Sequence, residues 1–194
     1  MKKTVIAALL FFAATAFTTS SAQVTDPTTT SQATDTVTAN FVSKARAANM
    51  MEIETGQLAQ QKGADQDVKQ FGSRMVQDHT AANEQLKQLT QAKKLDAGAQ
   101  AGADPKMASA MDKLRQASGA DFDKEYIRLQ LKAHAKNIAL FERASRDLPD
   151  QELRDFAAKT LPALKEHLEM AKAIAQRLKI DDSGAGGGYP GGNH

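Results

Sequence analysis

The stretch DQELRDFAAKTLPALKEHLEMAKAIAQRLK, residues 150 to 179, decides the fold class of this chain. Its small and apolar residues recur at three- and four-residue steps, which is typical of one stripe along a long amphipathic helix. The stripe consists of Leu153, Phe156, Ala157, Thr160, Leu161, Leu164, Leu168, Ala171, Ile174, Ala175 and Leu178. Pro162 and His167 lie in the same stretch. We therefore expect a helix that bends at its proline, one turn before a histidine on its apolar face.

Three earlier stretches show the same periodicity, at about residues 40 to 62, 65 to 94 and 121 to 147. The links Gly63-Ala64-Asp65 and Leu148-Pro149-Asp150 are so short that each must join two antiparallel neighbours. A Gly/Ala loop, closed by Asp104 as N-cap and Pro105 at the first helical position, leads into a shorter helix that ends near Gln116. The pattern predicts an all-α protein, an antiparallel four-helix bundle with a short extra helix between long helices 2 and 3.

The two ends of the chain differ from the bundle in composition. Residues 1 to 22 have a basic start, an apolar run and a small-residue end at Ala22, which is typical of a signal peptide cleaved there. We expect residues 23 to 38 to be a disordered Thr-rich linker and residues 181 to 194 a disordered Gly-rich tail. The bundle domain then covers residues 39 to 180.

Composition excludes several classes of function. The chain has no cysteine, so disulfides, thiolate metal sites and a lipid-modified cysteine are excluded. The signal peptide contains Lys2 and Lys3 and no acidic residue, so the mature chain has equal numbers of basic and acidic side chains. Because both signs alternate along every helix, we expect no nucleic-acid partner. The apolar run in the signal is too short for a retained transmembrane span, and we expect a periplasmic or secreted protein.

Four polar residues fall on the apolar faces of the four long helices, one on each: Glu52, His79, His134 and His167. At about 1.5 Å per residue, they lie roughly 17 to 28 Å from the nearer hairpin turn, in helices about 40 Å long. The four side chains could therefore meet near the middle of the bundle. Histidines with one carboxylate form a ligand set that suits Zn, Cu or Fe.

Other interpretations of these residues stay open at this stage. Each histidine could be a structural ring whose two nitrogens bond to a carboxylate, the backbone or water. The four groups could also form a polar core that responds to pH. The sequence contains no nucleophile elbow and no phosphate-binding loop.

One family resembles the chain over residues 41 to 178. The matching residues are Phe41, Glu52, Leu58-Ala59, Val68-Lys69-Gln70-Phe71, Met75-Val76, Asp78-His79, Phe122-Asp123, Tyr126-Ile127, His134, Leu161-Pro162 and His167-Leu168. Their order resembles the bacterial domain-of-unknown-function 4142 family. The resemblance implies a ferritin-like four-helix bundle in an exported protein of no settled activity. Ferritin-like di-iron proteins carry Glu-x-x-His on two helices. Here the residues three before the histidines are Val76, Leu131 and Leu164, which argues against di-iron chemistry.

The sequence alone favours an exported, non-enzymatic binding or envelope-stress module. A periplasmic metal-binding protein with a mononuclear site at Glu52, His79, His134 and His167 is the alternative. A third interpretation is a module for an unknown protein partner, for which the segment from Leu95 to Gln116 is the candidate surface.

Overall fold

The fold is described by a computed structural model that covers residues 27–93, 95 and 105–181. These residues form five helices and no strand. The helices are α1 (Pro27–Lys62), α2 (Gln66–Ala92), α3 (Pro105–Gln116), α4 (Gly119–Asp147) and α5 (Gln151–Arg177). The predicted all-α class and the short extra helix are confirmed. The proposed signal peptide, most of the Gly-rich tail and the proposed cap Asp104 lie outside the described residues.

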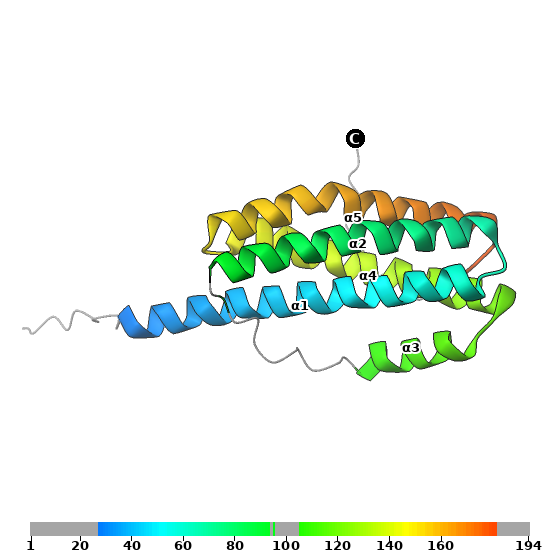
Figure 1. The fold of residues 1–194 in the computed structure, drawn as a ribbon, viewed down its shortest axis with the longest axis horizontal. Coiled ribbons are helices and arrows are strands. Elements are labelled where there is room, and N and C mark those ends of the chain that lie inside the picture. Colours follow the sequence, from blue (N-terminus) through cyan, green and yellow to red (C-terminus); the bar gives the residue numbers. More distant parts are fainter. Residues whose placement is uncertain (1–26, 94, 96–104, 182–194) are drawn as a thin grey trace, which may run out of the picture.

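The four long helices run side by side, with α3 apart on the outside (Figure 1). A backbone bridge joins Gly63 to Gly119, so the α1–α2 turn lies at the same end as the start of α4. At the opposite end, Lys93 Nζ lies 2.8 Å from an Asp150 carboxylate oxygen, next to the α4–α5 turn. The segment from α2 to α4 must therefore cross the length of the bundle. A single long crossover is the connectivity of ferritin-like bundles, as the resemblance implied.

The helix starts follow from capping side chains. The Asp65 carboxylate accepts hydrogen bonds from the backbone N–H groups of Asp67 (2.9 Å) and Val68 (3.3 Å), and Asp150 accepts one from Leu153 (3.0 Å). These bonds satisfy N–H groups that have no partner within the helix. Asp65 and Asp150 are therefore the N-caps of α2 and α5.

The first helix is longer than expected. It begins at Pro27, whereas residues 23 to 38 were predicted to be a disordered linker and the helix to start near Asn40. Proline is favoured at the first helical position, and no glycine or second proline follows before residue 40 to stop helix propagation. Figure 1 shows this first part of α1 projecting beyond the other helices. The linker prediction is therefore wrong from Pro27 onward.

Two glycines allow α1 and α2 to approach closely. A Cβ atom on Gly72 would lie 2.6 Å from the Ala59 Cβ and 2.8 Å from the Gly56 carbonyl oxygen. A Cβ atom on Gly56 would lie 2.6 Å from the Gly72 carbonyl oxygen. Because such contacts are shorter than van der Waals distance, the two backbones can cross here only without these side chains.

Pro162 lies inside α5, as predicted, and its side chain is exposed. The ribbon of α5 bows near its middle in Figure 1, which agrees with the expected bend. His167, one turn later, is buried. The proline therefore faces solvent while the histidine faces the core.

The core has apolar layers at both ends of the bundle and polar groups between them. Towards one end, Phe141 contacts Phe41 and Phe156, with ring centroids 5.3 and 6.0 Å apart. Towards the other, Tyr126 lies 5.8 Å from Phe122 and 6.0 Å from Phe71. Buried polar side chains at Asn49, Glu52, Thr55, His79, Gln130, His134 and His167 occupy the region between them.

Candidate metal centre

Three histidines from three helices meet in this polar middle layer. The ring centroids lie 5.8 Å (His79–His134), 5.5 Å (His79–His167) and 5.4 Å (His134–His167) apart. One ring nitrogen from each lies within 4.8 Å of the other two. The residues are 3%, 0% and 1% exposed for His79, His134 and His167, respectively. The predicted convergence of the three rings is confirmed.

Each ring is held by one hydrogen bond to an oxygen acceptor. His79 Nδ1 lies 2.9 Å from the side-chain oxygen of Asn49, and His134 Nδ1 lies 3.1 Å from the backbone carbonyl of Gln130. His167 Nε2 lies 2.9 Å from the Asp78 carboxylate. An oxygen of these types can only accept, so each of these ring nitrogens carries the proton and donates.

The second nitrogen of each ring has no hydrogen-bond partner. These atoms are His79 Nε2, His134 Nε2 and His167 Nδ1, all fully buried. Because the opposite nitrogen holds the proton, each of the three presents a lone pair. A buried acceptor without a donor is costly, and three from neighbouring rings are rare in a purely structural core.

Burial favours the neutral form of two of the rings, His79 and His167. Burial, and then the charges that His134 and His167 would carry, lower the pKa of His79 to about 3. Burial also lowers the pKa of His167, although its hydrogen bond to Asp78 opposes the shift. Neutral imidazole is the form that binds metal ions.

Glu52 reaches the edge of the histidine group but does not join it. Its Oε1 lies 3.9 Å from His134 Nδ1, the nitrogen that already bonds to the Gln130 carbonyl. The residue is fully buried, and neither carboxylate oxygen accepts a hydrogen bond. Burial raises its pKa, with His134 and the Gln130 side chain in partial opposition. Its role as a metal ligand stays a prediction.

Two further polar side chains, Tyr126 and Gln130, lie near Glu52. Burial and the Glu52 charge raise the pKa of Tyr126, whose hydroxyl has no hydrogen-bond partner. The Gln130 amide donates to the Thr55 hydroxyl over 3.2 Å, and its own side-chain oxygen has no partner. The side of the site formed by α1 and α4 is therefore polar and enclosed.

Two residues that hold the rings were missed from the sequence. Asp78 points about 100° away from its neighbour His79 on the helix, so it cannot pair with that ring. That direction takes it to His167 on α5 instead. Asn49 precedes Glu52 by one helical turn and so shares its face of α1, which was the available signal. Both bonds cross between helices and depend on how the helices are rotated.

No other group of three or more His, Asp or Glu residues in the described ranges has metal-binding geometry. The residues three positions before the histidines are apolar, and Leu131 and Leu164 belong to the buried core. The pair of Glu-x-x-His motifs that di-iron sites require is absent from α2, α4 and α5.

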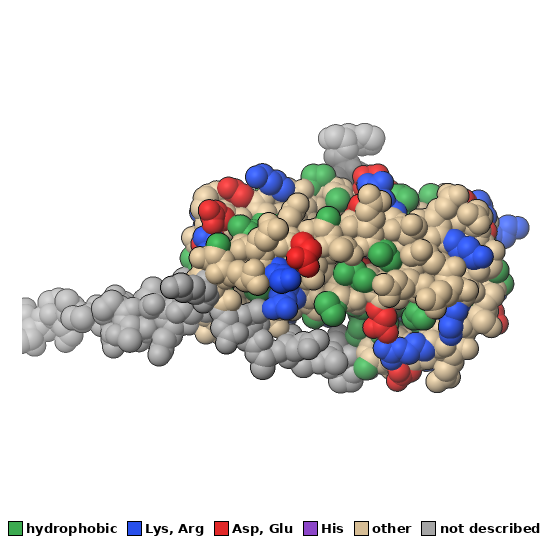
Figure 2. Space-filling model, in the orientation of Figure 1, with side chains coloured by type: hydrophobic (Ala, Val, Ile, Leu, Met, Phe, Trp, Pro, Cys, Tyr) green, Lys and Arg blue, Asp and Glu red, His purple; other side chains and the backbone are tan. Residues whose placement is uncertain are grey.

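The described helices and the face shown in Figure 2 can be characterised by hydropathy and by charge. None of the helices, over the residues that can be described, is long and apolar enough to cross a membrane. Figure 2 shows positive and negative side chains intermixed on the visible face. That face offers no continuous basic patch for a polyanion.

The comparisons with known proteins support the fold. The chain is similar to the crystal structure of a protein described as secreted, from the DUF305 group of Streptomyces coelicolor. The identity is 11%, the TM-score is 0.64, and the match covers 77% of this chain and 96% of that one. At this identity the likeness shows the fold alone. No curated protein matches the chain. The family model described as "Domain of unknown function (DUF4142)" matches residues 22–174, and the chain therefore belongs to that family.

Proposed function

We propose that this protein is exported and binds one transition metal ion through His79, His134 and His167. The proposal rests on the two nitrogens of each ring. One nitrogen donates a hydrogen bond to an oxygen, and the other is buried without a partner. Metal-bound histidines almost always donate their second nitrogen to a carboxylate, a carbonyl or a water. Asp78, the Gln130 carbonyl and Asn49 supply acceptors of these kinds, one for each ring.

The distances fit a site that contracts on binding. Bonds of about 2.0 Å to a tetrahedral ion bring ligand nitrogens to roughly 3.4 Å from one another. One nitrogen of each ring lies within 4.8 Å of the corresponding nitrogens of the other two, so each ring needs to shift by about 1 Å or less towards a common centre.

The three imidazoles indicate which metal ions the site would bind. Three neutral imidazoles suit Zn, Cu or Fe, and such a set leaves a fourth position for a small oxygen ligand. Glu52 and Tyr126 lie on the α1–α4 side of the site, where they supply a carboxyl and a hydroxyl without partners. The sequence alone favoured a binding or envelope-stress module with no named ligand, and the ring pairing leads us to prefer a metal ion as that ligand.

Export is part of the proposal. The signal-like residues 1 to 22 support it, as does the description of the DUF305 protein from Streptomyces coelicolor as secreted.

Thermal unfolding with and without metal tests the site. Chelator-treated protein should gain about 3 kcal/mol of stability when zinc, copper or cobalt chloride is present at a hundredfold excess over its dissociation constant. His134→Leu should lose that gain. The matched control is His194→Leu, which removes the histidine outside the described residues and should keep it. Equal gains in His134→Leu and wild type, or no gain with any of the metals, would refute the proposal.

A further inference from the structure

The three rings are buried, so a metal ion needs a route to them through the bundle. The helices of each hairpin, α1–α2 and α4–α5, pack along their length, and the Gly56–Gly72 crossing closes the first pair tightly. Two seams remain between the hairpins, α1–α4 and α2–α5. They differ in what covers them.

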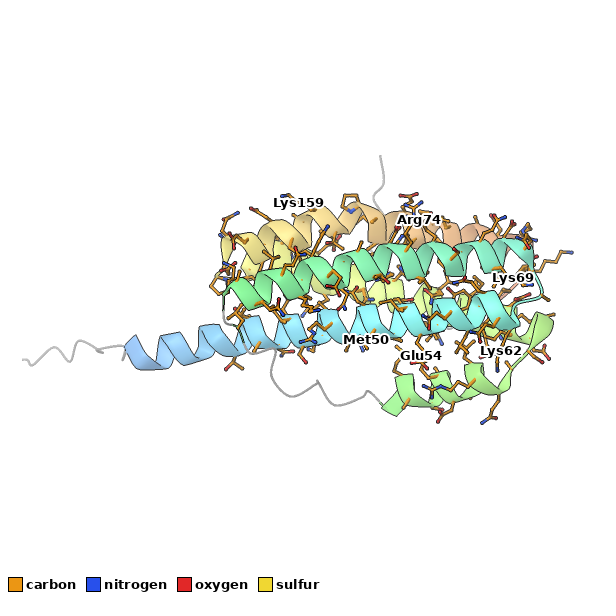
Figure 3. All side chains as sticks on the ribbon, in the orientation of Figure 1. Met50, Glu54, Lys62, Lys69, Arg74 and Lys159 are labelled. Atoms are coloured by element: carbon orange, nitrogen blue, oxygen red, sulfur yellow. The ribbon has the colours of Figure 1, made fainter. Side chains whose placement is uncertain are left out.

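The α1–α4 seam is covered from outside. Helix α3 lies along it, with Met111 and Leu114 buried in the core and Arg115 Nη2 2.7 Å from Glu54 Oε1 on α1. Figure 3 shows Glu54 on the side of α1 that faces α3. Inside the seam, the Gln130 side chain is fully buried. An ion arriving here would have to displace a helix.

The α2–α5 seam is closed by charged side chains instead. At one end, Lys93 of α2 reaches Glu152 of α5, with Nζ 2.6 Å from Oε2. At the other, Arg177 Nη2 lies 2.9 Å from Asp67 Oδ2. Each pair has at least one well-exposed partner, and surface pairs of this kind contribute little stability and open readily. The charged side chains that cover this seam can therefore separate without displacing a helix.

The middle of the α2–α5 seam lies next to the three-histidine cluster, His79, His134 and His167. Asp78 Oδ2 accepts the hydrogen bond from His167 Nε2 at 2.9 Å and also pairs with Arg74 Nε, one turn earlier on α2. The Asp78 side chain is 25% exposed and that of Arg74 is 42% exposed, whereas His167 is buried. Arg74 Nη2 also lies 3.9 Å from Glu166 Oε2 on α5. Figure 3 shows Arg74 on α2, close to α5.

We propose that the α2–α5 seam at Arg74 and Asp78 is the entrance through which a metal ion reaches the three histidines. In this proposal the Arg74 side chain blocks the entrance, and the Asp78 carboxylate is the first group that binds the incoming ion. The inference rests on the proposed metal site. A hydrated divalent cation competes with the guanidinium for the partly exposed carboxylate of Asp78. When Asp78 binds the ion, His167 loses the acceptor for its Nε2–H, and its ring is free to rotate and pass the ion inward.

The buried His167 ring connects the surface carboxylate of Asp78 to the three-histidine cluster. His167 Nδ1 has no partner and belongs to the three-histidine cluster, while Nε2 of the same ring touches Asp78. One imidazole thus joins the surface carboxylate to the binding site. The described residues contain no comparable link at the two ends of the seam, where Arg177 and Lys93 pair with acids remote from the rings.

Stopped-flow mixing of the chelator-treated mature protein with cobalt(II) chloride tests the entrance, followed by the ligand-field absorption of the bound ion. Arg74→Gln removes the guanidinium that blocks the entrance. Arg115→Gln is the matched control, because Arg115 is similarly exposed, pairs with two acids and carries the same charge, but lies on α3. Both variants change the net charge equally. A general electrostatic attraction would therefore affect the two alike.

Arg74→Gln should raise both the association and the dissociation rate by about fivefold, the factor expected for releasing one exposed ion pair. Arg115→Gln should leave both rates within about twofold of wild type. Equal rates in the two variants would overturn the entrance while leaving the metal site intact. Faster association without faster dissociation would also overturn it, because a side chain that blocks the entrance slows passage in both directions. Failure of wild-type protein to bind cobalt at equilibrium would overturn the site and the entrance together.

Discussion

Acid should destabilise the metal-free protein through His79, and the size of the effect follows from its pKa. The native pKa is about 3, against 6.5 for the free side chain. Between these values the unfolded state binds a proton at this site and the native state does not, so stability falls as pH falls. The difference is about 2 kcal/mol at pH 5 and about 3 kcal/mol at pH 4, relative to pH 8.

Denaturant unfolding of wild type and His79→Leu at pH 8, 5 and 4, in the presence of chelator, measures this difference. The stability of wild type should fall relative to the variant by the amounts just given. Lys159→Gln is the control, because Lys159 is exposed on α5, away from the histidines. Its stability should follow that of wild type at each pH. Parallel curves for wild type and His79→Leu would show that His79 is not held neutral, and would refute the reasoning.

Three further predictions concern the core. Gly72→Ala should cost about 1 to 3 kcal/mol, although alanine favours helix, because its Cβ would lie 2.6 Å from that of Ala59; unchanged unfolding in denaturant would contradict this. Glu52→Gln should become more stable relative to wild type as pH rises above 4.5, because burial raises the Glu52 pKa and the unfolded state alone ionises. A constant difference between pH 4.5 and 8 would argue against a buried, protonated carboxyl. Pro162→Ala should keep the fold and change the unfolding free energy by about 1 kcal/mol or less, because the backbone hydrogen bond that the helix regains offsets the packing that it loses. Circular dichroism and thermal unfolding check this, and loss of helicity would contradict it.

Much of the fold could be predicted because its signals are local. The 3.6-residue period places Leu153 and Leu164 on one face of α5, and Asp65 and Asp150 mark the helix starts as caps. The start of α1 was missed because residues 27 to 38 lack a strong apolar pattern, while helix propagation from Pro27 needs none.

The site could be predicted only in part. Mid-helix positions on the apolar faces were enough to bring His79, His134 and His167 together, because helical rise fixes their height. The bond from His167 to Asp78 could not be foreseen, because it depends on the rotation of α2 and α5 about their axes. The rotation of α1 about its axis could not be predicted either. It places Glu52 beside the protonated nitrogen of His134 rather than among the nitrogens without partners.

The metal content of the protein as isolated from its own cells tests the central claim most directly. Elemental analysis of wild type and His134→Leu, purified in parallel without added metal or chelator, compares the occupied site with a disabled one. We predict about one equivalent of a single transition metal per wild-type chain and less than about a tenth of that in the variant, because removing one of three ligands lowers affinity steeply. Equal metal content in the two proteins, or none in either, would contradict the account.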